Sequence, residues 1–208
     1  MPSTLFWGLK DEKREAIMSA GISEFGSYGY ENSSTNRIVQ KAGISKGSLF
    51  KYFPSKEDFY FYILEQITAE LISDLEGKTD ALPTELFQRI IAYSALEFAW
   101  YMQYPEKGRM IIKAFAKSDT AIYRKTVSKY GTSQKGLTDF FLQDIDTSRF
   151  RGDRQKTLCM IQWFLKGFNE DFLDRISMGE DDNLDKLKWE YTASLSEYME
   201  LLKTGILK

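Results

Sequence analysis

Residues Ser34–Lys56 read STNRIVQKAGISKGSLFKYFPSK, and this stretch decides the fold that we predict for the chain. It carries five cations and no carboxylate, although the whole chain of 208 residues has 28 lysines and arginines, 30 acidic residues and a formal net charge of −2. The cations are Arg37, Lys41, Lys46, Lys51 and Lys56. The positive charge is therefore a local feature and not a consequence of the overall composition.

The chemistry of the stretch divides it into two short helices joined by a tight turn. Ser34 or Thr35 can cap the first helix, because a hydroxyl accepts a hydrogen bond from an amide of the first helical turn. Gly43 is expected to adopt the left-handed conformation that ends a helix, and Ile44 supplies the hydrophobic contact that often follows. Ser45 then caps the second helix after about three residues, which is the geometry of a helix-turn-helix motif.

The second helix is predicted to have a buried side and an exposed side. Leu49 and Phe53 lie four residues apart and can anchor it to a core. Ser55 and Asp58 then resemble a capping box that starts a further helix. Cations on the exposed side suit a polyanion, because each neutralised phosphate releases condensed counterions. We therefore expect the motif, at about residues 34–53, to bind double-stranded DNA.

The predicted DNA contacts differ in kind along the motif. Lys46 and Ser48, at the start of the second helix, are placed to reach base edges, and Gly47 lets the helix approach closely. Phe50 is expected to pack against the sugar-phosphate edge or inward. The remaining predicted contacts are to phosphates and come from Thr35, Asn36, Lys51, Tyr52 and Lys56.

These residues resemble the DNA-binding domain of TetR-family transcriptional regulators over roughly residues 11 to 65. The matching positions include Ile17 to Ala20, Phe25, Gly29 and Tyr30, Ile38, Ala42 to Ser45, Gly47, Leu49 to Phe53 and Ser55 to Glu57. The chain departs from the family pattern at Gly21 and Val39, where the family often has alanine. At Phe50 it lacks the hydroxyl that the family's common tyrosine would offer to a phosphate.

The remainder of the chain is predicted to be helical, because prolines are few and no strand-like alternation persists. We expect an all-α fold of about nine helices. Residues 1–58 would form a three-helix DNA-binding domain, and residues 59–208 a helical effector-binding and dimerisation domain. The predicted helices outside the motif span about 11–28, 55–76, 84–104, 106–117, 119–145, 153–178 and 184–204.

The last two predicted helices are apolar on more than one face, and such a helix needs more than one neighbour. We therefore predict a homodimer in which these helices pair with their symmetry mates, as the resemblance also implies. The alternative is that both faces belong to the core of one protomer. The predicted interface residues are Leu158, Ile161, Leu165, Phe168, Phe172, Leu187, Tyr191, Leu195 and Tyr198. A two-fold dimer presents two recognition helices about 34–36 Å apart, which predicts a palindromic operator.

The resemblance also implies a small-molecule pocket in the larger domain, whose occupancy alters the spacing of the two DNA-binding domains. Ligand pockets are mostly apolar with a few polar anchors, and the aromatic content of 15% suits a lipophilic or aromatic effector. The alternative is that these residues are plain core. The candidates are Tyr62, Gln66, Phe98, Trp100, Tyr101, Tyr104, Phe115, Phe141, Met160, Trp163 and Phe164.

Composition also bears on the compartment and the chemistry. No apolar run approaches the roughly 18–20 residues of a membrane span, the N-terminus lacks a signal-peptide pattern, and the single cysteine, Cys159, excludes an internal disulfide framework. We expect a cytoplasmic protein without a membrane partner. The absence of histidine removes the usual general base and the commonest metal ligand, so we predict no metal site, no cofactor and no enzymatic activity.

The function that we expect is that of a repressor that occupies a promoter. A transcriptional activator is one alternative, and two other classes of function are a helical enzyme and a non-specific DNA binder. A helical enzyme would have to use Ser48 to Lys51 as an S-x-x-K motif, with Lys203 to Gly205 as K-T-G, but an S-D-N motif is missing and K-T-G would fall at a helix end. A non-specific architectural DNA binder would be basic throughout, whereas residues 61–208 carry 20 cations and 23 anions. Charge confined to one motif favours site-specific binding.

Overall fold

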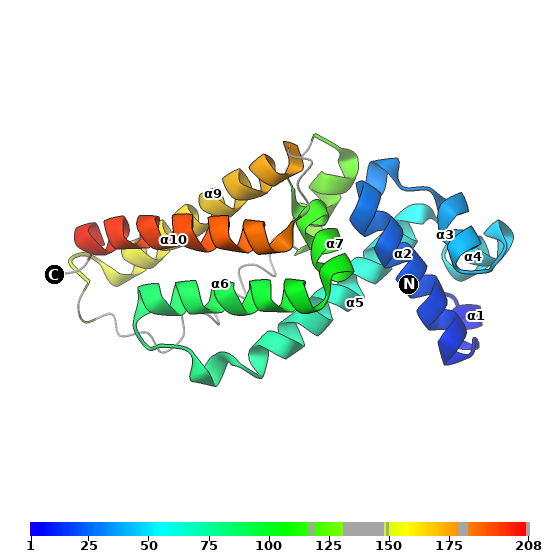
Figure 1. Ribbon diagram of the computed structural model, residues 1–208, viewed down its shortest axis with the longest axis horizontal. Helices are drawn as coiled ribbons and strands as arrows, with labels where there is room; N and C mark the ends of the chain where they lie inside the picture. The colour runs from blue at the N-terminus through cyan, green and yellow to red at the C-terminus, as the bar shows by residue number, and fades with distance from the viewer. Residues whose placement is uncertain (117–118, 131–147, 149, 179–182, 207–208) are drawn as a thin grey trace. The chain divides into compact units, whose positions relative to one another are not determined.

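The computed structural model describes residues 1–116, 119–130, 148, 150–178 and 183–206. Over these ranges the secondary-structure elements are helices, which confirms the all-α prediction (Figure 1). The predicted helix at 119–145 is described over 119–130 and is helical over 121–130, and residues 131–145 lie outside the described residues. No described helix has the length and apolarity that crossing a membrane requires.

Most helix bounds agree with the predicted ranges to within about two residues. The N-terminal helices are α1 (Thr4–Trp7), α2 (Asp11–Asn32), α3 (Thr35–Lys41), α4 (Lys46–Tyr52) and α5 (Lys56–Glu76). After the short 3-10 helix η1 (Thr79–Ala81) follow α6 (Leu86–Gln103), α7 (Pro105–Phe115), α9 (Arg154–Met178) and α10 (Leu184–Ile206). Sequence reasoning missed α1. The helical conformation of α2 is interrupted at Gly29, where φ is +66° and where the sequence predicts its end.

The chain folds into two compact units. The first unit contains Met1–Asp74 and Gln103–Ala114, and the second contains Leu75–Met102 and Phe115–Lys208. The boundary that we expected between residues 58 and 59 falls inside α5, and the first unit contains this helix as far as Asp74. Phe59 and Ile63 are fully buried there.

The packing of the first unit explains two glycines of α2. A Cβ atom on Gly21 would lie 2.4 Å from Ile63 Cδ1 and 2.7 Å from Phe59 Cζ, so the larger side chains of α5 occupy the space that an alanine would need. A Cβ on Gly26 would lie 2.9 Å from the carbonyl oxygen of Glu106 in α7. Helix α2 thus packs closely on both α5 and α7.

The turn between α3 and α4 has the geometry that the sequence predicts. Gly43 has φ +63°. The Gly43 amide donates to the Gln40 carbonyl at 3.3 Å, and the Ile44 amide donates to the Val39 carbonyl at 3.0 Å, which is a Schellman motif. Because the two helices are joined by this turn, their relative orientation follows from local chemistry.

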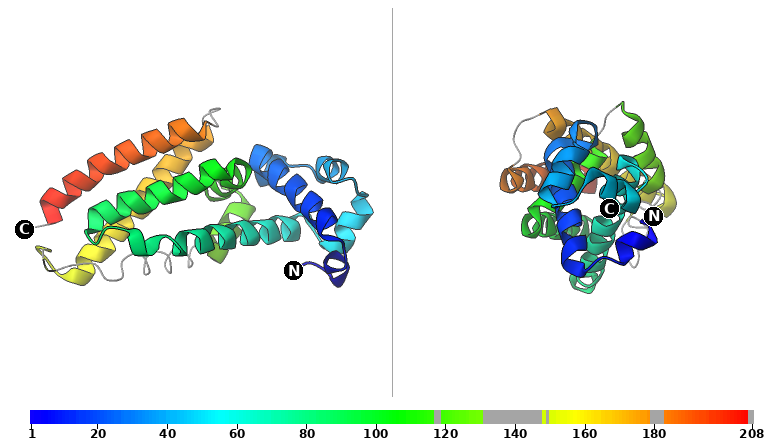
Figure 2. Two further views of the ribbon diagram at one scale, coloured as in Figure 1. Left: turned by 60° about the horizontal axis from the view of Figure 1, so that its bottom comes forward. Right: turned by 90° about the vertical axis from the view of Figure 1, so that its right-hand side faces the viewer.

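In the second unit, α6 and α10 run alongside each other, and α9 lies at an angle to both (Figures 1 and 2). The side chains that they direct inward are almost fully buried. They include Phe98 and Trp100 of α6, Ile161 and Phe168 of α9, and Leu195 and Met199 of α10. A core built from three helices accounts for one apolar face on each of them.

Candidate nucleic-acid interface

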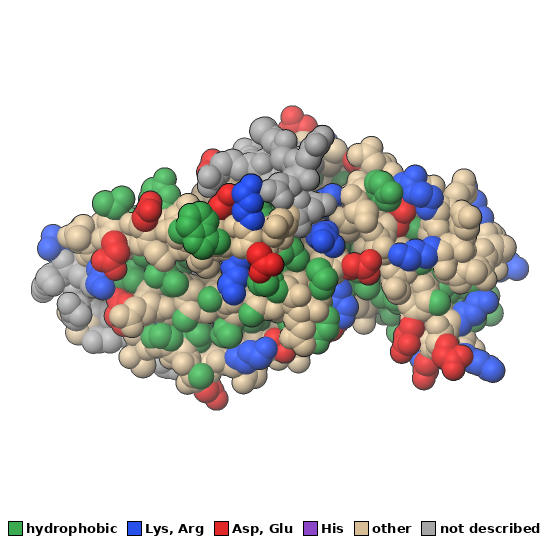
Figure 3. Space-filling view, viewed as in Figure 1, with side chains coloured by type: hydrophobic (Ala, Val, Ile, Leu, Met, Phe, Trp, Pro, Cys, Tyr) green, Lys and Arg blue, Asp and Glu red, His purple; other side chains and the backbone are tan. Residues whose placement is uncertain are grey.

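Helix α4 presents the predicted contact face to solvent. Leu49 is buried beneath the helix, whereas Lys46, Gly47, Phe50 and Lys51 are exposed. Ser48 and Tyr52 are half-buried, as is Thr35 at the start of α3, and Asn36 is exposed. Lysine and arginine side chains are visible over the part of the first unit that carries α3 and α4 (Figure 3). The structure therefore brings the predicted residues of α3 and α4 onto neighbouring helices.

Serine caps position the starts of both helices. Ser34 Oγ accepts from the Arg37 amide at the start of α3, and Ser45 Oγ accepts from the Ser48 amide at 3.0 Å at the start of α4. The hydroxyls of Ser45 and Ser48 also share a hydrogen bond of 2.8 Å. The hydroxyl of Ser48 thus already has a local partner at the end of the helix where a base contact is predicted.

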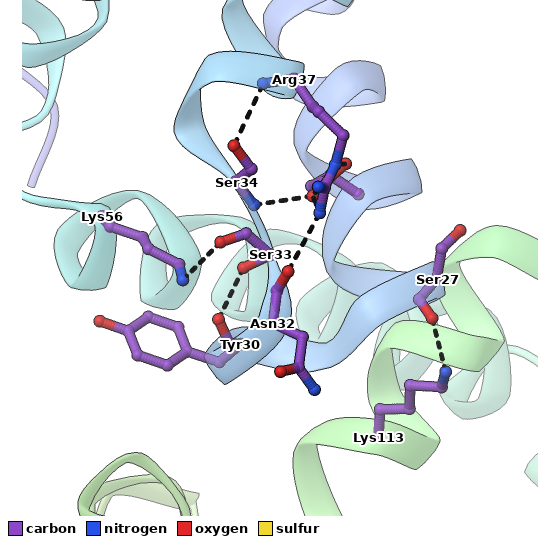
Figure 4. A network of polar contacts seen from close by, with 9 residues as sticks. Ser27, Tyr30, Asn32, Ser33, Ser34, Arg37, Lys56 and Lys113 are labelled. Carbon is purple, nitrogen blue, oxygen red and sulfur yellow. Dashed lines mark hydrogen bonds and ion pairs between the residues drawn. The ribbon is translucent and has the colours of Figure 1, made fainter.

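A buried carboxylate organises the start of α3 (Figure 4). Glu24 of α2 is only 7% exposed. It accepts from the Ser34 amide at 2.7 Å and from Arg37 Nε and Nη2 at 2.9 and 2.5 Å. Arg37 also donates to the Asn32 carbonyl at 3.0 Å and lies 4.3 Å from the centroid of the Tyr28 ring. The hydrogen bond with Glu24 raises the pKa of Arg37.

Lys56 lies within the same network instead of standing free at the surface. Its Nζ donates to the Ser33 carbonyl at 2.8 Å and lies 4.5 Å from the centroid of the Tyr30 ring. Burial lowers the pKa of Lys56. Figure 4 shows Lys56 directed at the segment between α2 and α3. Lys56 therefore ties α5 to the start of α3, and the phosphate contact that the sequence suggested for it stays a prediction.

The five cations of the motif consequently fall into two groups. Arg37 and Lys56 are held by Glu24 and Ser33, and Lys41 Nζ donates to Ser23 Oγ at 2.6 Å. Lys46 and Lys51 have no hydrogen bond or ion pair to their ammonium groups in the part of the chain that the structure describes. The charge available to a partner is therefore concentrated on α4.

Helix α1 closes the other end of α4. The Ser3 amide donates to the Tyr52 carbonyl at 2.9 Å, and Ser3 Oγ donates to the Lys51 carbonyl at 2.7 Å. Phe6 is 1% exposed, and its ring lies 4.9 Å from the centroid of Phe53 and 5.8 Å from that of Tyr62. These contacts satisfy carbonyls at the end of α4 that have no partner within the helix.

Glu24 and Ser3 are residues that sequence reasoning missed. An acidic residue within the apolar face of α2, between Gly21 and Phe25, was an available signal for Glu24. Ser3 before the apolar residues Leu5 and Phe6 could similarly have indicated a short capped helix. Neither pattern indicates the hydrogen-bond partner, which is Arg37 for Glu24 and Lys51 for Ser3.

The predicted pocket residues are distributed over both units. Tyr62, Gln66 and Tyr104 belong to the first unit, where Tyr62 contacts the Phe6 and Phe53 rings and Gln66 is exposed. The second unit contains the other candidates in different settings. Phe98, Trp100 and Tyr101 are buried, Phe115 and Phe164 are half-buried, Met160 and Trp163 are exposed, and Phe141 lies outside the described residues.

The predicted interface residues are mostly inside the protomer. Ile161, Phe168, Phe172, Leu187, Tyr191 and Leu195 are buried, Leu158 and Leu165 are half-buried, and only Tyr198 is exposed. The opposite faces of α9 and α10 carry the exposed apolar side chains, with Trp163 at 74% and Trp189 at 71%. Met160 and Leu201 are also exposed. Hydrophobic side chains reach the surface over α6 and α10 in Figure 3.

Within the described residues, no group of three or more Cys, Asp or Glu side chains is arranged to hold a metal ion. The second unit does contain a polar group that sequence reasoning missed. The Tyr101 hydroxyl donates to Glu97 Oε1 at 2.6 Å, and the Tyr191 hydroxyl donates to Asn169 Oδ1 at 2.7 Å. An isolated acidic residue on an apolar helix was the signal for Glu97.

Comparison with known proteins finds a family match for part of the chain. Residues 17–63 match the bacterial regulatory proteins of the tetR family. The HTH-type transcriptional regulator RutR of Escherichia coli (strain K12) is 31% identical over 99 residues, which are 47% of this chain and 45% of RutR. The match thus spans about half the length of this curated relative.

Solved structures extend the likeness in fold to the whole chain. A TetR family transcriptional regulator from Chloroflexus aurantiacus has a TM-score of 0.64 at 19% identity, covering 100% of this chain and 99% of that one. The transcriptional regulator FadR from Bacillus subtilis, solved in complex with stearoyl-CoA, has a TM-score of 0.64 at 16% identity, covering 92% and 98%. The chain therefore carries, at residues 17–63, a DNA-binding domain of the kind found in the tetR family of bacterial regulatory proteins, and its likeness to these solved structures over the remaining residues is one of fold.

Proposed function

We propose that this chain is a site-specific DNA-binding transcriptional regulator with α4 as its recognition helix. The observation that carries the proposal is the exposed face of α4, where Lys46 and Lys51 present ammonium groups that have no partner among the described residues. Helix α3 and its caps hold this face in place. A protein that acts on bacterial DNA works in the cytoplasm, which is where we propose that it acts.

Gly47 supports a close approach of α4 to DNA. A Cβ atom there would lie 3.8 Å from Ser45 Oγ, which is an ordinary contact, so the fold does not require glycine at this position. Glycine inside a helix costs about 1 kcal/mol relative to alanine. A glycine that the fold does not need suits a position where the surface of a partner comes close.

We assign different roles to the lysines of the motif. Lys46 would read base edges and Lys51 would contact phosphates, together with Asn36 at the start of α3. Lys56 would act as a positioning residue, because its ammonium group is already bonded to the Ser33 carbonyl. Specificity would then depend on Lys46 and general affinity on Lys51.

We propose that the protein acts as a homodimer on a palindromic operator. Trp163 and Trp189 are exposed on α9 and α10, and exposed apolar surface of this kind is characteristic of protein interaction sites. The dimer would therefore use the outward faces of α9 and α10, and not the stripe that fills the core of the protomer. One recognition helix covers few base pairs, so a dimer is needed to reach two successive major grooves.

We further propose that a small molecule bound in the second unit weakens DNA binding, so that the protein represses by occupying a promoter until the effector arrives. A change of about 1–3 kcal/mol in DNA affinity is enough for such a response. The FadR structure with stearoyl-CoA supports a ligand site in this fold, since the two chains share their architecture over 92% of the present one.

The experiment that tests the proposal is a titration of the full chain against labelled DNA from upstream of its own gene, with random DNA as competitor and at several salt concentrations. We expect binding that survives the competitor and protects a palindrome. Binding that the competitor abolishes would contradict site specificity at this DNA. An absence of binding even at low salt would contradict DNA recognition by α4.

A further inference from the structure

Helix α6 places an unusual group of side chains on one face in the second unit. Tyr93, Glu97 and Tyr101 follow one another at four-residue spacing, which brings them together on a helix. The Tyr101 hydroxyl donates to Glu97 Oε1 at 2.6 Å. Tyr101 is almost fully buried, and Glu97 as a whole residue is half-buried, so the hydrogen bond to Tyr101 anchors the Glu97 carboxylate inside the unit.

The two C-terminal helices complete the surroundings of this face. Tyr191 of α10 is buried, and the centroid of its ring lies 5.0 Å from that of Phe98 on α6. Its hydroxyl donates to Asn169 Oδ1 of α9 at 2.7 Å and is also hydrogen-bonded to Ser94 of α6. Tyr191 lies close enough to Glu97 for the carboxylate to contribute to raising the pKa of Tyr191, so α10 as well as α6 contributes an aromatic ring near Glu97.

Within the part of the chain that the structure describes, the carboxylate of Glu97 has no positively charged partner. No lysine or arginine among the described residues is ion-paired with it, and its described hydrogen bond comes from the neutral Tyr101. Burial raises the pKa of Glu97 and also raises the pKa values of Tyr93, Tyr101 and Tyr191. The three tyrosines thus remain neutral near pH 7 and supply rings and hydroxyls, but no charge that could balance a carboxylate.

A carboxylate among aromatic rings is the chemistry that recognises an organic cation. Buried charges are normally paired, and aromatic faces attract ammonium groups, most strongly where water is excluded. We propose that Glu97, together with the rings of Tyr93, Phe98 and Tyr101, forms a binding site for an organic cation, namely a protonated amine or quaternary ammonium with an apolar body. Binding of the cation does not depend on the proposed function. Only the further step, that this ligand is the effector of the regulator, rests on the proposed function.

The experiment compares three probes that differ only in the head group. Isothermal titration of the full chain at neutral pH would use 4-phenylbutylamine, 4-phenylbutanol and 4-phenylbutanoate. We expect the amine to bind at least about tenfold more tightly than the alcohol, a difference of about 1.4 kcal/mol, and the carboxylate to bind most weakly. Because DNA is absent from this titration, the result is independent of whether the DNA-binding proposal holds.

A variant then assigns the effect to Glu97. Glu97→Gln keeps a hydrogen-bond acceptor for Tyr101 and should reduce the affinity for the amine to that for the alcohol, while the affinity for the alcohol stays the same. Glu200→Gln removes an exposed carboxylate of α10 in the same unit and should leave both affinities unchanged.

Three outcomes would overturn the proposal. The first is equal binding of amine and alcohol to the natural sequence, the second is an unchanged affinity of Glu97→Gln for the amine, and the third is no binding of any probe at millimolar concentration. The comparison of head groups needs no variant, so it remains decisive if Glu97→Gln fails to fold.

Discussion

Glu24 and Glu97 are both acidic residues on core-forming helices, yet their surroundings are opposite. Glu24 accepts from the Ser34 amide and from two nitrogens of Arg37, whereas Glu97 accepts from one neutral hydroxyl, that of Tyr101. Burial raises the pKa of Glu97, and the hydrogen bond from Tyr101 opposes this effect only in part. The comparison teaches that pairing, and not burial, separates a carboxylate that supports the fold from one that is available to a ligand.

The largest effect that we expect comes from removing the paired carboxylate. Glu24→Ala would leave the Ser34 amide unsatisfied and Arg37 without its partner, so the free energy of unfolding should fall by about 2–3 kcal/mol. Urea denaturation measures this. Glu15→Ala, an exposed position on the same helix, should change the value by less than about 0.5 kcal/mol. Equal changes in the free energy of unfolding for the two substitutions would contradict the stabilising role that we assign to Glu24.

The unpaired carboxylate should respond in the opposite direction. Glu97→Gln removes the charge and keeps the acceptor, so the ligand-free protein should gain about 1 kcal/mol at neutral pH, a modest value because the residue is half-buried. Since burial raises the pKa of Glu97 in the folded state, the natural protein is most stable with this group protonated. Its stability should fall as pH rises from the unfolded pKa through the folded pKa.

Unfolding measured at intervals between pH 5 and pH 8 checks this sign. The advantage of Glu97→Gln should grow as the pH rises and should shrink toward the acid end of the range. A loss of stability in the variant at neutral pH would mean that Glu97 has a stabilising partner, and the contrast with Glu24 would no longer hold.

The same distinction between paired and unpaired groups divides the lysines of the motif. Lys56→Ala should lower the free energy of unfolding by about 1 kcal/mol, because it removes the hydrogen bond to the Ser33 carbonyl. Lys51→Ala should leave stability unchanged but weaken binding to all DNA sequences and reduce the salt slope by about one. Denaturation and DNA titrations on both variants decide this, and a stability loss confined to Lys51→Ala would reverse our assignment.

The last comparison concerns two glycines, Gly47 of α4 and Gly21 of α2. The added Cβ in Gly47→Ala would make only an ordinary contact, at 3.8 Å from Ser45 Oγ, so stability should rise by up to about 1 kcal/mol. If α4 approaches DNA closely, the same methyl group should weaken operator binding. Gly21→Ala is the contrasting variant, because its Cβ would collide with Ile63 and Phe59 and should destabilise the fold. Undiminished DNA affinity in Gly47→Ala would argue against close approach at this residue.

Sequence reasoning was most successful where structure depends on neighbours along the chain. The caps at Ser34 and Ser45 and the left-handed Gly43 involve bonds across three to five residues, and all three are present. The charge state of the interface could not be predicted in this way. Arg37 meets Glu24 across 13 positions and Lys56 meets Ser33 across 23, so only the folded structure shows which cations are already engaged.

Periodicity has a similar limit in the second unit. The helical periodicity of the sequence identifies two apolar faces on α9. Because both faces have the same spacing, periodicity does not indicate which face is buried within the protomer. Ile161 is fully buried and Trp163, two residues later, is 74% exposed. The predicted interface stripe proved to be mainly protomer core, because packing among α6, α9 and α10 determined which face turned inward.

The contact of Ser3 with the carbonyls of Lys51 and Tyr52 has a practical consequence for anyone handling this protein. A purification tag or fluorescent fusion added before Met1 would emerge beside the end of α4, within a few residues of the predicted contact face. Such an addition would compete with DNA for space beside α4 and would weaken the contacts of Ser3 with the carbonyls of Lys51 and Tyr52. Labels intended to leave DNA binding intact belong after α10, which is part of the other compact unit.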